Sequence, residues 1–440
     1  MSILDNITEE EYEELEITIH EVLYDKLHDD ILTMSSPNFH NNMVDEISEL
    51  IHDSWLDAGL CDEDDYEDIY DLMFQITESF FDIFEDEIPR RSYICTQMTT
   101  QPNILDISNQ LHYLKNTYQP RQRTLEWYEY RYDLITASNI WKLYSTESQV
   151  NSLIYEKCKP FDPTSNQSHN WHACGSLQWG IIYETMSIQI YETMYHTKVD
   201  DFGCIQHPTY KCIGASPDGI NIDPSSERYG RMIEVKNIVN REITGIPKLE
   251  YWIQMQVQME TCDLNECDFI ETRFKEYNDE NEYYMDESNR DYKGVILCFI
   301  QRDVVNSPPT YKYMPIEYDF KDKNIVDNWI NETKELMKSE YLLYTTNYWY
   351  LDEFSCVLVK RNRLWFQHAV PVVLNAWETI VNERQTGYEH RMAKKRKPNP
   401  NVFMSTLNSD PNVHVIHNLP PTNAVCLVKL SSNTNYSLEL

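Results

Sequence analysis

Hydrophobic and polar residues alternate along the first 90 positions in a pattern that predicts helices. In residues 17–27 and again in residues 69–76, apolar side chains recur every three or four positions, which places them on one face of a helix. Acidic clusters lie between these positions, and Pro89 closes the segment. We therefore expect residues 1–90 to form a small helical module with acidic faces.

Three further parts follow this module. Residues 91–120 have few hydrophobic repeats and are predicted to be a connector, and residues 121–390, which are denser in aromatic residues, are expected to form the main domain. Residues 391–440 include the basic run Lys394–Lys397 and a stretch rich in Pro, Asn and Ser, which predicts a flexible tail. The basic run is compatible with a nuclear-localisation-like or phosphate-contacting patch, and equally with a solvated linker.

Several elements can be assigned inside the main domain. Residues 294–300 form a continuous apolar run suited to a buried strand, and residues 324–339 and 364–384 are predicted to be helices. The polar and acidic stretch 276–293 is expected to be an exposed loop or hairpin tip.

Residues 253–259 give two conflicting signals. Gln and apolar residues alternate with period two, which by pattern alone indicates a strand. Gln and Met are better helix formers than strand formers, so we predict a helix with Gln254 and Gln258 on one face.

The charge is concentrated in one segment. The whole chain has a net charge of −35, which is unfavourable for a protein that contacts nucleic acid. Residues 1–90, however, contain 28 acidic residues and only two basic ones, a net charge of −26, and the remaining 350 residues have a net charge of −9. The acidity is therefore a property of the N-terminal module and does not exclude a DNA-binding domain after it.

Cellular location is constrained by two absences in the sequence. No stretch approaches 18 apolar residues and the N-terminus lacks a secretory pattern, so we expect no membrane span and no secretion. The 11 cysteines are dispersed without a Cys-x-x-Cys pair, which is typical of reduced intracellular thiols and argues against a zinc ribbon or an iron–sulfur cluster.

The most informative residues are Asp218, Glu234 and Lys236. Asp218 lies between Pro217 and Gly219 in a predicted turn, and the string Ile-Glu-Val-Lys after residue 232 alternates like a strand. Glu234 and Lys236 would then share one face of that strand, about 7 Å apart. Two carboxylates beside a lysine can hold a hard divalent cation and hydrolyse a phosphodiester. Taken alone, the three residues are equally compatible with a turn aspartate and an exposed strand face.

A third carboxylate comes from a helical stripe. Leu177, Ile181, Glu184, Ile188 and Tyr191 are spaced to lie on one face of a helix. A carboxylate within an apolar stripe is costly unless it is paired, binds a cation or reaches solvent at the helix edge. We predict that Glu184 faces the metal site.

Residues 124–144 are predicted to be a helix, a turn and a second helix. Thr124 can cap the first helix, which contains Arg131, and Thr136 can cap the second, whose first turn contains Ser138. A helix start with a free hydroxyl and a nearby arginine suits a phosphate. An ordinary capped helix with a surface arginine is the alternative.

These blocks together resemble the phage-type alkaline exonucleases, which are similar to lambda exonuclease and to the YqaJ-type viral recombinases, within the PD-(D/E)xK nuclease superfamily. The matching blocks occur in family order between about residues 121 and 275, and long forms are typical of large double-stranded DNA viruses. They are Glu126-Trp127 through Arg131, Ile135 through Ser138, Gly180 through Glu184, Ser216 through Gly219, Glu234 through Lys236, and Gln254-x-Gln256.

The resemblance implies a role for each matched residue. Asp218, Glu234 and the Val235 carbonyl would bind Mg²⁺ or Mn²⁺, as two ions, with Glu184 serving a metal directly or through water. Lys236 would position the attacking water and help to deprotonate it. The remaining matched positions would hold the 5′ phosphate or orient the site: Arg131, Ser138, Ser216 and Gln254.

The resemblance also implies a fold and partners. The fold would be a mixed α/β, restriction-endonuclease-like core, in which a mixed β-sheet is flanked by helices and Asp218 and Glu234 lie on adjacent strands. The substrate would be double-stranded DNA ends, with a single-strand-annealing or other recombination or replication protein as a partner, at an intracellular site of viral DNA replication. The sequence does not fix the oligomeric state.

Two features depart from the family pattern. Glu234 follows Asp218 by 16 positions, which predicts a loop or extended hairpin between the strands. Residues 1–90 match nothing in the family, and we expect them to cover the DNA groove or to recruit a basic partner.

Three functions remain open from the sequence. The first is a metal-dependent 5′→3′ exonuclease that acts on double-stranded DNA in viral recombination, repair or genome processing. The second is a structure- or sequence-directed endonuclease on the same core. The third is a catalytically silent protein that binds DNA or a partner.

Overall fold

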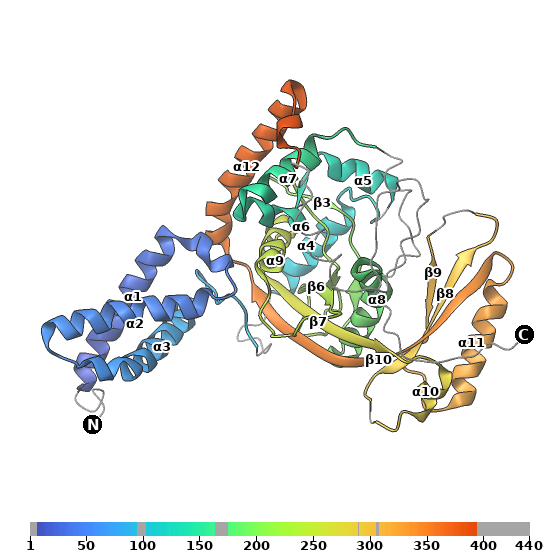
Figure 1. Cartoon of the computed structure of the whole chain (residues 1–440), viewed down its shortest axis with the longest axis horizontal. Helices are drawn as coiled ribbons and strands as arrows, with labels where there is room; N and C mark the ends of the chain where they lie inside the picture. Colours follow the sequence, from blue (N-terminus) through green and yellow to red (C-terminus); the bar gives the residue numbers. More distant parts are fainter. Residues whose placement is uncertain are drawn as a thin grey trace, which may run out of the picture. The chain divides into compact units, whose positions relative to one another are not determined.

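The structure is a computed structural model that describes residues 7–94, 103–122, 124–162, 175–288, 290–304 and 308–393 (Figure 1). The basic run Lys394–Lys397 and the tail that follows it lie outside the described residues. None of the helices in the described ranges is long and apolar enough to cross a membrane.

The helices of the described residues fall into an N-terminal group and a group that surrounds the sheets (Figure 1). The first group is α1 (Glu9–Asp29), α2 (Phe39–Ala58) and α3 (Tyr66–Ile83). The second group is α4 (Ile104–Asn116), α5 (Leu125–Tyr132), α6 (Ala137–Ile140), α7 (Glu147–Cys158), α8 (Ser176–Tyr195), α9 (Leu249–Cys262), α10 (Glu280–Met285), α11 (Lys323–Met337) and α12 (Arg363–Thr386).

Short 3-10 helices lie between several of these elements. They are η2 (Ile31–Ser35), η3 (Glu63–Asp65), η4 (Trp141–Tyr144) and η6 (Glu389–Arg391).

The strands of the described residues form two sheets. A small sheet has the order β1-β4-β3, and a larger, mixed sheet has the order β2-β5-β6-β7-β10-β8-β9. The strands are β1 (Ile135–Thr136), β2 (Val199–Asp200), β3 (Ile205–Gln206), β4 (Ile213–Ala215), β5 (Gly219–Asn221), β6 (Met232–Asn237), β7 (Glu266–Glu276), β8 (Lys293–Gln301), β9 (Thr310–Tyr313) and β10 (Tyr341–Lys360).

The centre of the larger sheet is a β6–α9–β7 unit, in which β6 and β7 are parallel. Ile233 and Val235 of β6 pack with Tyr191 of α8, whereas Met232, on the other face of the strand, packs in the same core as α9. Strand side chains alternate between faces, so α8 and α9 cover opposite faces of the sheet. The predicted mixed α/β fold, with a mixed sheet flanked by helices, is confirmed.

The N-terminal group consists of helices, as the apolar spacing predicted. Thr8 and Glu11 form a capping box at the start of α1, and Gly59 adopts the left-handed conformation (φ 69°) that ends α2. The buried side chains of α1 and α3 include Ile19 and Ile76, while acidic residues lie on the exposed faces.

Several other predicted elements are confirmed, and three expectations need correction. The helix at 253–259, the strand at 294–300 and the helices at 324–339 and 364–384 are present as α9, β8, α11 and α12. The expected connector 91–120 contains α4, because Leu111 and Leu114 are buried against the core. The expected loop 276–293 contains α10, anchored by the buried Tyr283. The predicted second helix of residues 124–144 is only one α-turn, α6, followed by a 3-10 turn.

A loop of ten residues between β5 and β6 accounts for the long spacing between Asp218 and Glu234. Arg228 and Arg231, at the end of this loop, both pair with Asp268 of β7, and all three side chains are buried. Asp268 also accepts a hydrogen bond from Tyr191 Oη at 2.6 Å. The loop is therefore fixed to the sheet at the point where β6 begins.

We predict that Asp268→Asn lowers the free energy of unfolding by about 3–5 kcal/mol, because it leaves two buried guanidinium groups without their common counter-ion. The midpoint of urea denaturation measures this change. Glu227→Gln is the matched control, since Glu227 lies on the same loop and is exposed. Equal midpoints for the two variants would contradict the structural role of Asp268.

Candidate active site

The structure brings Asp218 and Glu234 together on adjacent strands. Asp218 lies immediately before β5, whose Gly219 is paired with Ile233 of β6. A Cβ atom at Gly219 would collide with Val199 Cγ1 of β2, so the close approach of β2 requires glycine here. The Asp218 Oδ2 atom accepts a hydrogen bond of 2.8 Å from the Val235 backbone N–H. This bond holds the Asp218 carboxylate against the strand segment that contains Glu234 and Lys236.

Glu234 is fully buried and has two partners. Its Oε1 atom pairs with Lys236 Nζ, and its Oε2 atom accepts a hydrogen bond of 2.8 Å from Gln258 Nε2 of α9. The predicted alternation on β6 is correct, since Glu234 contacts α9 whereas Val235 packs towards α8. The carboxylate and the ammonium thus lie on one face of the strand.

The charges of the cluster act on one another. Burial, together with the charges of Glu234 and Glu184, raises the pKa of Asp218 well above its usual range, while Lys236 and the Val235 N–H oppose this rise. Burial alone would lower the pKa of Lys236, but Glu234 and Asp218 raise it above its ordinary value. Lys236 is therefore an ammonium that neutralises part of a carboxylate cluster.

Glu184 enters the site from α8. It is half-buried, and its charge contributes to the raised pKa of Asp218. Ile188 and Tyr191, which continue its stripe, pack against β6, so the stripe lies along the sheet as the spacing predicted. Glu184 and Glu234 thus both lie within electrostatic reach of Asp218.

The donor chemistry of these residues fits a hard divalent cation. Carboxylate oxygens are the ligands that Mg²⁺ and Mn²⁺ prefer, and a cation would relieve the repulsion that raises the pKa of Asp218. Across the described ranges, no three or more His, Cys, Asp or Glu side chains lie close enough to form a ready-made metal cage. Val235 contacts the cluster through its N–H, and its carbonyl as a metal ligand stays a prediction.

The predicted phosphate residues Arg131 and Ser138 also lie together. The Arg131 guanidinium stacks on the Trp127 ring at 3.9 Å and donates hydrogen bonds to Thr136 Oγ1 at 3.1 Å and to Ser138 Oγ at 3.5 Å. Thr124 caps α5 through the Trp127 N–H, as predicted, but the Thr136 side chain makes no capping bond and instead accepts from Arg131. The Arg131 guanidinium is therefore held by side chains and not by a helix terminus. We call Arg131, Thr136 and Ser138 the cationic corner.

Two glutamines of α9 differ in their contacts with the site. Gln258 bonds to Glu234 and donates a hydrogen bond of 3.3 Å to the Ser216 carbonyl, whereas Gln254 makes no hydrogen bond to either of them in the described part of the chain. Gln254 lies one turn earlier and is partly exposed. The sequence pattern placed both glutamines on one face, but it did not single out Gln258 as the partner of Glu234.

Tyr251 is another neighbour that the sequence did not identify. The Lys236 Nζ atom lies 4.9 Å from the centre of its ring, within reach of a cation–π contact. A tyrosine two positions into a predicted helix gives no sequence signal of this role, because the contact depends on how α9 returns over β6.

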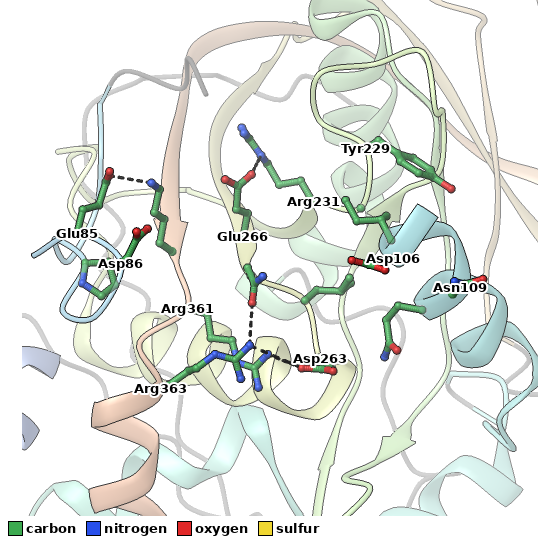
Figure 2. A pocket seen from close by; sticks show the side chains of 17 residues that line it. Glu85, Asp86, Asp106, Asn109, Tyr229, Arg231, Asp263, Glu266, Arg361 and Arg363 are labelled. Carbon is green, nitrogen blue, oxygen red and sulfur yellow. Dashed lines mark hydrogen bonds and ion pairs between the residues drawn. The ribbon is translucent and has the colours of Figure 1, made fainter. Parts of the chain in front are cut away.

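A pocket of about 690 Å³ lies elsewhere, at the end of the sheet where β6 and β7 begin (Figure 2). Several of its charged side chains form ion pairs, among them Arg231 with Glu266 at 2.9 Å and Arg361 with Asp263 at 2.6 Å. None of the predicted site residues lines it. We therefore place the candidate active site at the Asp218–Glu234 cluster and not in this pocket.

The fold and this cluster together define the class of protein. It is a mixed α/β protein with an Asp and a Glu-x-Lys string on adjacent strands. Residues 126–265 match the family model of the YqaJ-like viral recombinase domain. The family expected from the motifs is thereby confirmed for this segment.

Individual relatives are distant. The uncharacterized protein R354 of Acanthamoeba polyphaga mimivirus is 23% identical over 336 residues, or 69% of this chain, and this match spans 60% of that relative's length. Crystal structures of the alkaline exonuclease LHK-Exo from Laribacter hongkongensis, alone and with dAMP, are 17% identical. Each match covers 61% of this chain and 95% of the other, with a TM-score of 0.32.

We predict that Gln258→Leu lowers the free energy of unfolding by about 1.5–3 kcal/mol, because a buried carboxylate loses a hydrogen-bond donor. Gln254→Leu on the same helix is the matched control and should change stability by less than about 0.5 kcal/mol. Urea denaturation of both variants tests the assignment, and a larger loss for Gln254→Leu would reverse it.

Proposed function

We propose that this protein is a metal-dependent DNA exonuclease that degrades double-stranded DNA from 5′ ends in viral recombination, repair or genome processing. The observation that supports it most is the convergence of Asp218, Glu234 and Lys236, with Glu184 within electrostatic reach. Such a group has a chemical use in phosphodiester hydrolysis, and it is costly for a protein that only binds DNA.

Asp218, Glu234, Glu184 and the Val235 carbonyl would hold Mg²⁺ or Mn²⁺. When bound, such ions would supply Lewis-acid activation of a water and stabilise the negative charge on the leaving oxygen. Lys236, held by Glu234, orients the attacking water beside the scissile phosphate. Gln258 keeps Glu234 in place from the other side.

The cationic corner at Arg131 explains the proposed preference for ends. Arg131, Ser138 and Ser216 would hold a terminal 5′ phosphate, and Gln254 would orient it. An enzyme that grips the phosphate at one end of a strand and cuts beside it advances in the 5′→3′ direction. Double-stranded DNA ends are therefore the proposed substrate, with an annealing or replication protein as the proposed partner at the site of viral DNA replication.

We predict that Lys236→Met lowers the rate of nucleotide release from linear, 5′-phosphorylated duplex DNA by about 10²–10³-fold, because it removes the ammonium that orients the attacking water and offsets part of the carboxylate charge. Lys275→Met is the matched control, since Lys275 lies on the neighbouring strand β7 and pairs at the surface with Asp352. Covalently closed circles should survive the wild-type protein. Rapid cutting of circles would favour the endonuclease alternative, and no cleavage of any DNA would favour a silent binding protein.

We predict that Asp218→Asn weakens Mn²⁺ binding in the absence of DNA by roughly tenfold or more, because affinity for hard cations follows the number of charged ligands. Isothermal titration calorimetry measures this affinity directly. Asp223→Asn, on the adjoining loop, is the control and should leave the affinity unchanged. Identical affinities for the two variants would remove Asp218 from the metal site.

A further inference from the structure

Lys157, on α7, is a buried ammonium directly beneath the cationic corner. Lys157 is 6% exposed, and its Nζ atom donates a hydrogen bond of 2.8 Å to the Arg131 carbonyl. Arg384 of α12 donates in turn to the Lys157 carbonyl at 2.9 Å, so the helix end that presents Lys157 is held from a second side. The position of the ammonium is thus fixed by its surroundings.

No carboxylate of the described chain forms an ion pair with Lys157. Glu156, its neighbour on the helix, is instead 3.4 Å from Lys142 and points to the exposed side. Burying a charged ammonium without a counter-ion is unfavourable, and burial lowers the pKa of Lys157 to about 8, with Arg131 and Arg384 adding to the effect. The protein therefore maintains a cation here at a cost in stability.

Arg131 also lacks a carboxylate partner among the described residues. Its described partners are the Trp127 ring and the hydroxyl groups of Thr136 and Ser138, and none of them is an anion. Burial lowers its pKa as well. Lys157 thus contacts the backbone of Arg131, and neither side chain has a carboxylate partner among the described residues, so the component missing from this site is an anion.

The buried thiol of Cys204 links this pair to Ser216. Burial raises the pKa of Cys204, whereas Arg131, a hydrogen bond with Ser216 and Lys157 each act to lower it. Lys157 and Arg131 therefore lie within electrostatic reach of the buried Cys204 thiol, and Ser216 lies within hydrogen-bonding reach of it. Ser216 in turn lies two positions before Asp218, so the cation pair adjoins the candidate catalytic cluster.

We infer that Lys157 is a positioning residue for a terminal phosphomonoester of DNA: its ammonium, beneath Arg131, makes the corner doubly positive and so selects 5′-phosphorylated ends. This inference rests on the proposed nuclease function and deepens it. A phosphomonoester approaches two negative charges at neutral pH, whereas an internal phosphodiester carries one. Two cations match the two charges of a phosphomonoester. One cation alone would not distinguish a phosphomonoester from a phosphodiester by charge.

The test compares the rates at which linear duplexes with 5′-phosphate and 5′-hydroxyl ends are degraded. For Lys157→Met, we expect the preference for 5′-phosphate ends to fall by about tenfold to a hundredfold, the value of one to two lost charge-assisted contacts. The rate on 5′-hydroxyl ends should stay near that of the wild type. Lys157→Arg should retain the preference, because it preserves the charge.

Lys159→Met is the matched control, since Lys159 follows on the same chain segment and is exposed. An unchanged preference in Lys157→Met, or an equal fall on both kinds of end, would overturn the inference. A wild-type protein that degrades DNA without preferring 5′ phosphates would overturn it too, while leaving the nuclease proposal intact. A wild-type protein that degrades no DNA would instead contradict the proposed function itself.

A second measurement applies if Lys157→Met does not fold. Wild-type protein is treated with an amine-acetylating reagent without metal, in the presence of either duplex, and modification of Lys157 is followed by mass spectrometry. We expect the 5′-phosphorylated duplex to protect Lys157 several-fold more than the 5′-hydroxyl duplex. Equal protection would overturn the inference.

Discussion

The repulsion between buried carboxylates is the constraint on which the rest of this structure depends. Glu234 has no exposure to solvent, and Asp218 lies within the electrostatic influence of both Glu234 and Glu184. Such a cluster is unstable unless several partners compensate it at once. Lys236, the Val235 N–H and Gln258 supply this compensation, and each comes from a backbone position that the β5–β6 pairing or the return of α9 over the sheet creates.

The two ends of β6 differ in how completely their charges are paired. Where the strand begins, Arg228 and Arg231 share Asp268, and Arg231 also pairs with Glu266 beside the nearby pocket (Figure 2). Further along the strand, the carboxylates outnumber Lys236, and across from them Arg131 and Lys157 have no described carboxylate. The first end has the charge balance of a structural anchor. The second separates an excess of negative charge from an excess of positive charge, which suits a cation and a phosphate bound side by side.

The sequence predicted the elements whose signal is local. Alternation gave the correct faces of β6, and propensity gave the helix α9 against a misleading period of two. The 20-residue strand β10 had no such signal, because it pairs with β7 along one half and with β8 along the other, and its exposure varies accordingly. The sequence also did not predict contacts between residues that are far apart in the chain. Gln258 and Lys157 act through Glu234 and Arg131, which are 24 and 26 residues away, and no spacing rule connects them.

The distribution of charge limits where DNA can bind. The N-terminal 90 residues have a net charge of −26, and Arg90, one of their two basic residues, is already paired with Glu78 and Asp82. A surface of this charge repels phosphates within about 8–10 Å at physiological salt, so it cannot contribute to a DNA grip. Affinity for a DNA end must then come from cations outside this N-terminal module. A site built from Arg131 and Lys157 would meet this requirement at the one place where an end, and not a continuous duplex, supplies the extra negative charge.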